Sequence, residues 1–386
     1  MSAKEIELHD WVITNLSKIV GASDRKKLPA LVAQCLEQRS IDGIDYYRVT
    51  ESMDSLSRGM LVTAEAVVAD YPRIRRVFHL THAITKYYYS PFYVEQLVPG
   101  YHARFVRLQN RTIAFTRGGR ACPFTTDRAG DLVPAAFFEE NPGLILCMAV
   151  SGVGTPYSAP AASGSEEDLQ GWAVDLLERD VKEPLSPEQK YAIFDRYELA
   201  AVPHAGPFTA EDLEPLRAWV GELDAQGATG VVLKPSDRRH RPLKYATPSE
   251  LLCPLPVGAW LALQGAASDP CLQRLLRAAF SLSEFRQGGE EIDWQGTGKM
   301  LLEPFLDALH QLADGEGLRQ ERSVWVHEKE AAEKLLAHLR QAGSGVKIEP
   351  LDLQAEEGGW RLRFVEHYSE ATAALAHRLS GASYLD

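Results

Sequence analysis

Residues 91–126 read PFYVEQLVPGYHARFVRLQNRTIAFTRGGRACPFTT, and this stretch decides the fold class. Apolar and polar positions alternate on both sides of the turn residues Gln109 and Asn110, which is the period of half-buried strands. The pattern predicts strands joined by a short turn, and therefore a β-rich centre.

Strand-like and helix-like patterns on either side of this stretch do not follow the regular order of βαβ units. Strand-like runs lie at Leu144–Val150, Trp172–Leu177 and Gly230–Leu233, and helical spacing marks Pro187–Tyr197 and Ala210–Gln226. We therefore expect an α+β fold rather than a doubly wound parallel sheet.

The two ends of the chain suggest further modules. Helical spacing at Ile6–Val20 and Leu28–Glu37 precedes a strand-like YYRVTESM at residues 46–53. Apolar residues recur at helical spacing from Ala259 to Leu318, which fits either a dimerisation module or core. We expect four domains: an N-terminal module at 1–69, a central domain at 70–253, a helical, dimerisation-type module at 254–320 and a small C-terminal α+β domain at 321–386.

Composition indicates an ordinary globular protein. The chain has 386 residues, of which 45% are hydrophobic and 24% charged. Its five cysteines form no C-x-x-C pair, and neither a membrane helix nor a signal peptide is evident. These features predict a cytoplasmic, non-membrane protein without a zinc ribbon.

Charge is segregated along the chain although the net charge is -12. Between Tyr71 and Arg120 the only acid is Glu95, and the bases are Arg73, Arg75, Arg76, Lys86, Arg104, Arg107, Arg111, Arg117 and Arg120. A second cluster contains Arg238, Arg239, His240, Arg241 and Lys244. The two clusters either form unrelated solvated faces or converge on a groove for a polyanion, and the tyrosines interleaved with the first cluster favour a partner with stackable bases.

Two short motifs do not support the chemistry they resemble. The fragment GTGKM at 296–300 lacks the glycine of a phosphate loop at Asp293 and the hydroxyl residue at Met300. His79 and His82 lie three residues apart without a carboxylate or cysteine nearby, so packing or exposure explains them better than a metal site.

Several segments, read in order, resemble the archaeal-type homodimeric ATP-dependent RNA ligases, which are covalent nucleotidyltransferases. The resemblance covers roughly residues 70–386 and is carried by PFYVEQLVPGYHARFVR, FTRGGRACPFTTDRA, GWAVDLL, TGVVLKPSDRR, PLKYATPS and the closing HYSEATAALAHRLSGASYLD. It implies a ligase-type nucleotidyltransferase domain built of antiparallel sheets, with ATP and Mg²⁺ as family cofactors and RNA as the family substrate.

The resemblance also implies which reactive groups this chain has lost. In the family a lysine in E-K-x-x-G-Y attacks the α-phosphate of ATP, and two glutamates in later segments support ribose and metal binding. The lysine position is Leu97 here, and the glutamate positions are Ala149 and Thr229. No lysine lies between Tyr87 and Gly119, so a shifted register does not restore the nucleophile.

Other positions of the family pattern are kept. The positions expected to contact nucleotide or RNA phosphates are Gly100, Tyr101, Arg104, Arg117, Lys234 and Lys244. Arg238, Arg239 and Arg241 are possible further RNA contacts. Each also has a structural explanation: Gly100 would permit a turn, Tyr101 would belong to the core, and the arginines of 238–241 would be plain surface.

The sequence therefore predicts a degenerate RNA-ligase-like protein that binds RNA ends or a nucleotide in a basic cleft, as a homodimer and without lysyl-adenylate formation. One alternative is an active ligase that uses another nucleophile or joins pre-adenylated RNA with the help of Lys234 and Lys244. A second is a non-catalytic partner that acts through its helical segment. No metal site, and no certain cofactor, is predicted.

Overall fold

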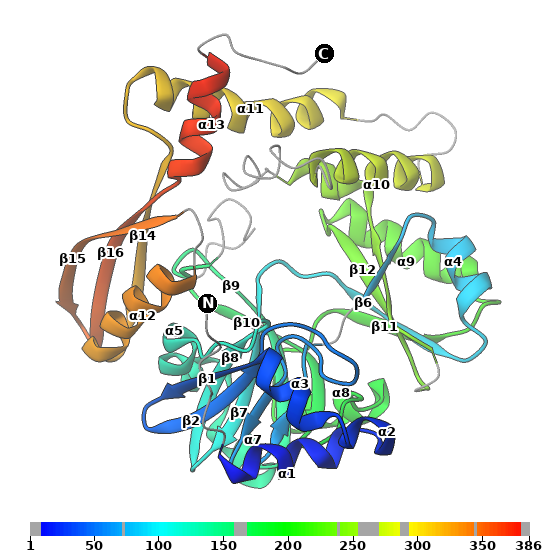
Figure 1. The fold of residues 1–386 in the computed structure, drawn as a ribbon. Helices are drawn as coiled ribbons and strands as arrows, with labels where there is room; N and C mark the ends of the chain where they lie inside the picture. Colours follow the sequence, from blue (N-terminus) through cyan, green and yellow to red (C-terminus); the bar gives the residue numbers. More distant parts are fainter. Residues whose placement is uncertain are drawn as a thin grey trace. The chain divides into compact units, whose positions relative to one another are not determined.

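The computed structural model describes residues 9–71, 74–157, 168–237, 240–253, 270–285, 293–342 and 346–379. The chain divides into two compact units, each assembled from three separate stretches (Figure 1). The first unit consists of Met1–Arg73, Tyr101–Val150 and Gln170–Ala201. The second consists of Ile74–Gly100, Ser151–Leu169 and Val202–Asp386.

The first unit begins with three helices and a small sheet. Its elements are α1 (Asp10–Ile19), α2 (Ala22–Arg25), α3 (Leu28–Cys35), β1 (Leu36–Ile41), β2 (Ile44–Val49), β3 (Leu61–Thr63) and β4 (Val67–Val68). The strands pair in the order β1-β2-β3-β4, all antiparallel. The helix predicted to run to Glu37 ends at Cys35, where β1 begins, because the chain turns there into the pairing that joins Leu36 with Val49.

A second antiparallel sheet completes the first unit. Its strands are β7 (Tyr101–Leu108), β8 (Arg111–Thr116), β9 (Leu144–Ser151) and β10 (Gln170–Glu178), in the order β10-β9-β7-β8. The helices of this part are α5 (Pro123–Asp127), α6 (Ala129–Leu132), α7 (Ala135–Glu140) and α8 (Pro187–Arg196). Gln109 and Asn110 both adopt positive φ, as the tight turn of a β7–β8 hairpin requires. The predicted hairpin is confirmed.

The core of the first unit lies between its two sheets. Val106, Ile113 and Ile145 from the larger sheet pack with Ile44 and Leu61 from the smaller one. Alternate residues of β7 point into this core, so the polar positions of that face, Arg104 among them, are held inside the unit.

The second unit contains a five-stranded sheet covered by helices on one face. Its elements are β5 (Arg75–Val77), α4 (Leu80–Tyr87), β6 (Phe92–Gln96), β11 (His204–Phe208), α9 (Leu213–Ala225), β12 (Gly230–Pro235), β13 (Leu243–Ala246) and the 3-10 helix η2 (Pro248–Leu252). The strand order is β11-β6-β12-β13-β5. Apolar residues of α4 and α9, such as Ile84 and Val220, pack on Val94, Val231 and Leu233 of the sheet. The helix predicted from Ala210 begins at Leu213, because the Asp212 carboxylate accepts hydrogen bonds from Thr209 in a preceding turn.

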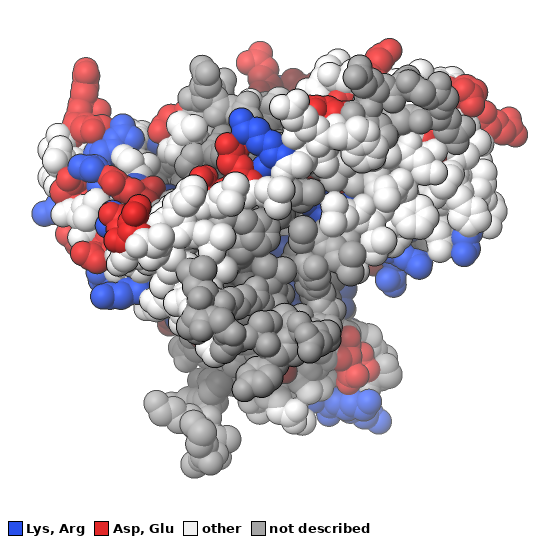
Figure 2. Space-filling model, turned by 90° about the horizontal axis from the view of Figure 1, so that it is seen from above, with Lys and Arg blue, Asp and Glu red and all other residues white. Residues whose placement is uncertain are grey.

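The rest of the second unit comprises two long helices and a small α+β layer. These elements are α10 (Pro270–Phe285), α11 (Trp294–Ala313), β14 (Arg319–Val326), α12 (Lys329–Ala342), β15 (Lys347–Glu356), β16 (Gly359–His367) and α13 (Ser369–Leu379). The strands pair in the order β14-β16-β15. Arg363 pairs with Glu321 and Asp352 across the three strands, and Figure 2 shows blue and red side chains lying side by side at its left.

The α+β class with antiparallel sheets is confirmed, and none of the described helices is long and apolar enough to span a membrane. Residues 254–269 and 286–292 of the predicted helical module, and residues 380–386 of the closing segment, lie outside the described residues. The four-domain division stays a prediction.

Candidate functional site

The position expected to carry the nucleophile lies at the end of β6. The backbone N–H of Leu97 donates to the carbonyl of Gly230, at an N to O distance of 2.8 Å. A Cβ placed on Gly230 would lie 3.3 Å from Cδ2 of Leu97. Thr229, the position of one lost carboxylate, directly precedes Gly230. The end of β6 and the start of β12 therefore bring together two positions that carry no charged group.

One face of the five-stranded sheet carries charged residues. Strand register places Glu95 opposite Val232 and places Val232 opposite Lys244, so these side chains project from one face, as does Lys234 two residues further along β12. The opposite face is the apolar one that packs on α4 and α9. Lys234 and Lys244 therefore project from one face of the second unit's sheet, whereas Arg104 and Arg117 belong to the first unit.

Glu95 and Lys234 form a buried ion pair on this face. Oε2 of Glu95 lies 3.8 Å from Nζ of Lys234, and the residues are 1% and 6% exposed. A buried carboxylate needs such a cation, because its transfer from water is costly. Glu95 was not predicted as a site residue, although its position as the only acid in the basic stretch was a signal that it has a specific partner.

Two further cations lie beside Lys244. Arg76 of β5 is the strand partner of Lys244. Glu250 accepts two hydrogen bonds from Arg277 and lies 3.6 Å from Arg76. Burial and the neighbouring Arg277 lower the pKa of Arg76 from its usual value, although Glu250 opposes this effect.

The glycine and tyrosine of the family motif have identifiable structural roles. Gly100 adopts φ +129°, a conformation that favours glycine. The hydroxyl of Tyr101 lies 2.8 Å from Oγ1 of Thr125, which lies 2.8 Å from Sγ of Cys122. Cys122 caps α5 by accepting from the Thr125 N–H. Burial raises the pKa of Tyr101 well above 10.

Arg104 and Ala149 lie inside the first unit. Arg104 is 0% exposed, and its guanidinium donates to the carbonyls of Ala69, Gly59 and Thr116. Ala149 is also 0% exposed. Arg104 therefore links the two sheets of the unit through its hydrogen bonds. This geometry does not favour the contact with a phosphate that the sequence predicted for Arg104.

The remaining predicted arginines lie at different places. Arg117 is exposed, at the end of the β8 segment. Arg241 is exposed and its carbonyl accepts a hydrogen bond from the Tyr88 hydroxyl, with an O to O distance of 3.0 Å. Arg238 and Arg239 lie outside the described residues.

The donor set does not fit a nucleotide-bound Mg²⁺ of the family type. The two positions that would supply carboxylates hold a buried methyl group at Ala149 and a hydroxyl at Thr229. In the part of the chain that the structure describes, no group of three or more His, Cys, Asp or Glu is arranged to hold a metal ion.

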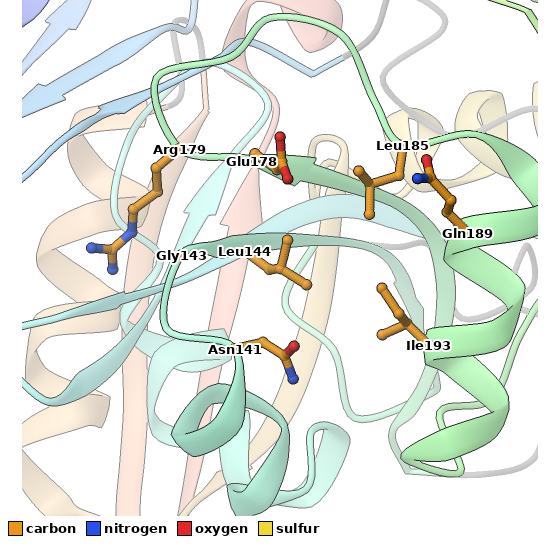
Figure 3. Close-up of a pocket in the computed structure, with 8 residues that line it drawn as sticks. All are labelled: Asn141, Gly143, Leu144, Glu178, Arg179, Leu185, Gln189 and Ile193. Atoms are coloured by element: carbon orange, nitrogen blue, oxygen red, sulfur yellow. The ribbon is translucent and has the colours of Figure 1, made fainter.

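A separate pocket of about 650 Å³ lies within the first unit (Figure 3). The side chains of Leu144, Leu185 and Ile193 point toward one another there, and Arg179 points away toward Glu65, at an N to O distance of 3.4 Å. None of the sequence-predicted site residues lines this pocket. Its apolar floor and paired arginine do not suit the phosphates of a nucleotide.

Comparisons with known proteins agree with this arrangement of strands. A family model described as the C-terminal region of the ligase Pab1020 matches residues 263–382. An uncharacterised protein of Methanocaldococcus jannaschii is 25% identical over 302 residues, which are 76% of this chain and 75% of that protein.

Two solved structures extend the similarity over nearly the whole chain. A candidate ATP-dependent DNA ligase of Aquifex aeolicus is 26% identical with a TM-score of 0.83, covering 93% of this chain and 99% of that one. An archaeal ATP-dependent RNA ligase is 25% identical with a TM-score of 0.79, covering 93% and 96%. The family model and both structures show that this chain is similar to ligases in sequence and in fold.

Proposed function

We propose that this chain is a degenerate ligase that binds RNA ends or a nucleotide on the polar face of the β6–β12–β13 sheet without forming a lysyl-adenylate. The observation that carries the proposal is Leu97. Its side chain has no nucleophilic atom, and it lies against Gly230 at the place where the family's amine would attack. Covalent nucleotidyl transfer requires that amine, because it splits one difficult displacement into two feasible ones.

The lysines of this face support binding better than they support attack. Lys234 is almost fully buried and paired with Glu95, whereas an attacking lysine must be deprotonated and reach the phosphate. Lys244 is half-buried and lies next to Arg76. Lys244 and Arg76 are the cations of this face that suit a polyanion, because the charge of Lys234 is already compensated by Glu95. RNA is the preferred polyanion because an archaeal RNA ligase shares this fold.

Two measurements on the full chain test the proposal. After incubation with α-labelled ATP and Mg²⁺ or Mn²⁺, denaturing electrophoresis should show no labelled protein. Titration of fluorescent RNA oligonucleotides should show binding that weakens linearly with the logarithm of salt concentration. A labelled protein band would overturn the loss of adenylation, and the absence of salt-dependent RNA or nucleotide binding would overturn the binding function.

A second candidate function is the joining of pre-adenylated RNA. Its support is the retention of Lys234 and Lys244 on one face of the sheet while the nucleophile is lost. Sealing of a pre-adenylated strand to an RNA acceptor would establish it, and Lys244→Ala should then abolish sealing. If the wild-type chain leaves both strands unjoined, only the binding function stands.

Homodimer formation is a further part of the proposal. Exposed apolar side chains on α10 and α11 support it, and they are Leu275, Leu276, Phe280, Trp294, Leu302 and Leu306. Sedimentation should give a dimer for the wild type, and a dimer that persists in a Leu302→Glu, Leu306→Glu variant would exclude this surface. We also place the protein in the cytoplasm, which the free thiols Cys35 and Cys253 support.

A further inference from the structure

The second unit brings two basic clusters together that are about 150 residues apart in the sequence. The first lies at the end of α4 and just after it, and includes Lys86 and Tyr89, and the second is the loop with His240 and Arg241. Oγ of Ser90 lies 3.3 Å from Nδ1 of His240, although the two residues are 150 positions apart in the sequence. The Tyr88 hydroxyl, which is buried, lies 3.0 Å from the carbonyl of Arg241.

The resulting surface has an aromatic ring presented to solvent. Tyr89 is 82% exposed, which is unusual for a large aromatic side chain. One edge of its ring is fixed, because its hydroxyl donates to the carbonyl of Lys86 over 3.1 Å and its centroid lies 5.9 Å from that of His240. The ring is therefore oriented before any ligand arrives, which lowers the entropy cost of stacking.

Three exposed cations belong to the segments that adjoin Tyr89 and His240. They are Arg75, Lys86 and Arg241, and Lys86 and Arg75 lie 5.3 and 5.1 Å from the centroid of Tyr87. Asp237 in the same loop is engaged by His240, whose Nδ1 lies 2.9 Å from its Oδ1. The three long side chains therefore present positive charge to solvent in this part of the second unit.

We propose that this Tyr89 surface, formed by Arg75, Lys86, Tyr89, His240 and Arg241, is a docking platform for single-stranded RNA. An unpaired base stacks on Tyr89, and Lys86 and Arg241 contact the phosphates on either side. Exposed aromatics among basic side chains bind single strands in this way, because every base has a face to stack. The inference rests on the proposed RNA-binding function and names the form of RNA that the chain takes.

The platform is distinct from the position of the lost nucleophile. It lies where β6 begins and β12 ends, since the N–H of Ser236 donates to the carbonyl of Pro91 there. Leu97 contacts Gly230 at the other end of the same two strands. Five strand residues separate the two ends, roughly 17 Å. One RNA strand can therefore be held on the platform while its end lies near Leu97.

Binding of a fluorescent uridine oligonucleotide by Tyr89 variants tests this inference. We expect Tyr89→Ala to weaken binding at least fivefold and Tyr89→Phe to leave it unchanged, because stacking needs the ring and not the hydroxyl. Leu351→Ala is the control, because Leu351 is also an exposed apolar side chain, at 46%, but lies on β15. A parallel titration with oligo-dT measures how far the platform distinguishes RNA from DNA. A blunt RNA duplex should compete poorly for the platform, because its bases are paired.

The salt dependence gives a second readout. The Lys86→Ala, Arg241→Ala variant should lower the slope of log affinity against log salt by about 1.4, because two phosphate contacts are lost. Arg111→Ala, which removes an exposed arginine of the first unit paired with Asp42, should leave the slope unchanged. If the wild type binds RNA and the Tyr89→Ala and double variants bind it equally well, the platform is wrong and the proposed function stands. If the wild type binds no RNA, the platform is wrong, and the proposed function then fails as well unless the wild type binds a nucleotide.

Discussion

Lys234 and Glu95 form an ion pair between neighbouring strands, and both side chains are almost completely removed from water. The pair occupies the polar face of the second unit's sheet, two residues before the position where the nucleophile of an active ligase would stand. Because each charge compensates the other, both can remain buried on this face.

Replacement of one partner of this pair should lower the free energy of unfolding more than replacement of both. We expect Lys234→Met to lower the free energy of unfolding by about 3–5 kcal/mol, because it leaves the Glu95 carboxylate buried without this cation. The Glu95→Gln, Lys234→Met variant should recover much of the loss. Urea unfolding of the two single variants and the double variant measures the coupling, and additive effects would contradict the pairing.

Restoring the lysine alone should not restore adenylation. In Leu97→Lys the amine returns at the end of β6, but Ala149 and Thr229 still offer no carboxylate for ribose or metal. We expect no labelled protein after incubation with α-labelled ATP and Mg²⁺. The variant Leu97→Arg serves as a control for a charged side chain without nucleophilicity. Strong labelling of Leu97→Lys would mean that the carboxylates are dispensable.

Replacement of Arg104 should destabilise the protein far more than replacement of Arg117, although both belong to the same basic stretch. Arg104→Ala removes donors from the buried carbonyls of Ala69 and Gly59, and each group left unsatisfied costs about 1–3 kcal/mol. Arg117 is exposed, so Arg117→Ala should change stability by less than about 0.5 kcal/mol. Thermal and urea unfolding of the two variants provides the test, and equal effects would exclude the structural role of Arg104.

The half-buried Tyr101 of the first unit should contribute to alkaline unfolding. Burial raises the pKa of Tyr101 well above its usual value of 10, so the folded state keeps a proton that the unfolded state loses. Stability from this group is complete below about pH 10 and falls as pH rises toward the folded pKa, by about 1.4 kcal/mol per pH unit. Tyr101→Phe should remove this part of the slope between pH 10 and 11. An unchanged slope would show that the hydroxyl is not buried.

The sequence predicted those parts of the fold whose signal is local. The β7–β8 hairpin followed from alternation around Gln109 and Asn110, and α8 followed from its helical spacing and is fixed by a capping box of Ser186 and Gln189. Strand β1 was missed because only Leu36 and Ile41 among its residues are buried, which leaves no clear alternation. The pairing that makes it a strand comes from β2.

The sequence predicted which reactive groups the site lacks better than it predicted which residues are in contact. The resemblance singled out Leu97 and Thr229, and the structure places Leu97 against Gly230, the residue after Thr229. The burial of Arg104 was not predictable, because one-dimensional alternation does not say whether a polar face meets solvent or another sheet. The Tyr88–Arg241 contact likewise joins segments that only tertiary packing brings together.

The interleaved construction of the two units has an evolutionary consequence. Since each is assembled from three separate stretches, a gene cut at codon 100 or 150 encodes neither unit complete. Such a reading frame cannot exchange one unit with another gene by simple recombination, and it must diverge as a whole. Substitution at a single position such as residue 97, in contrast, changes one side chain and leaves this interleaved architecture intact.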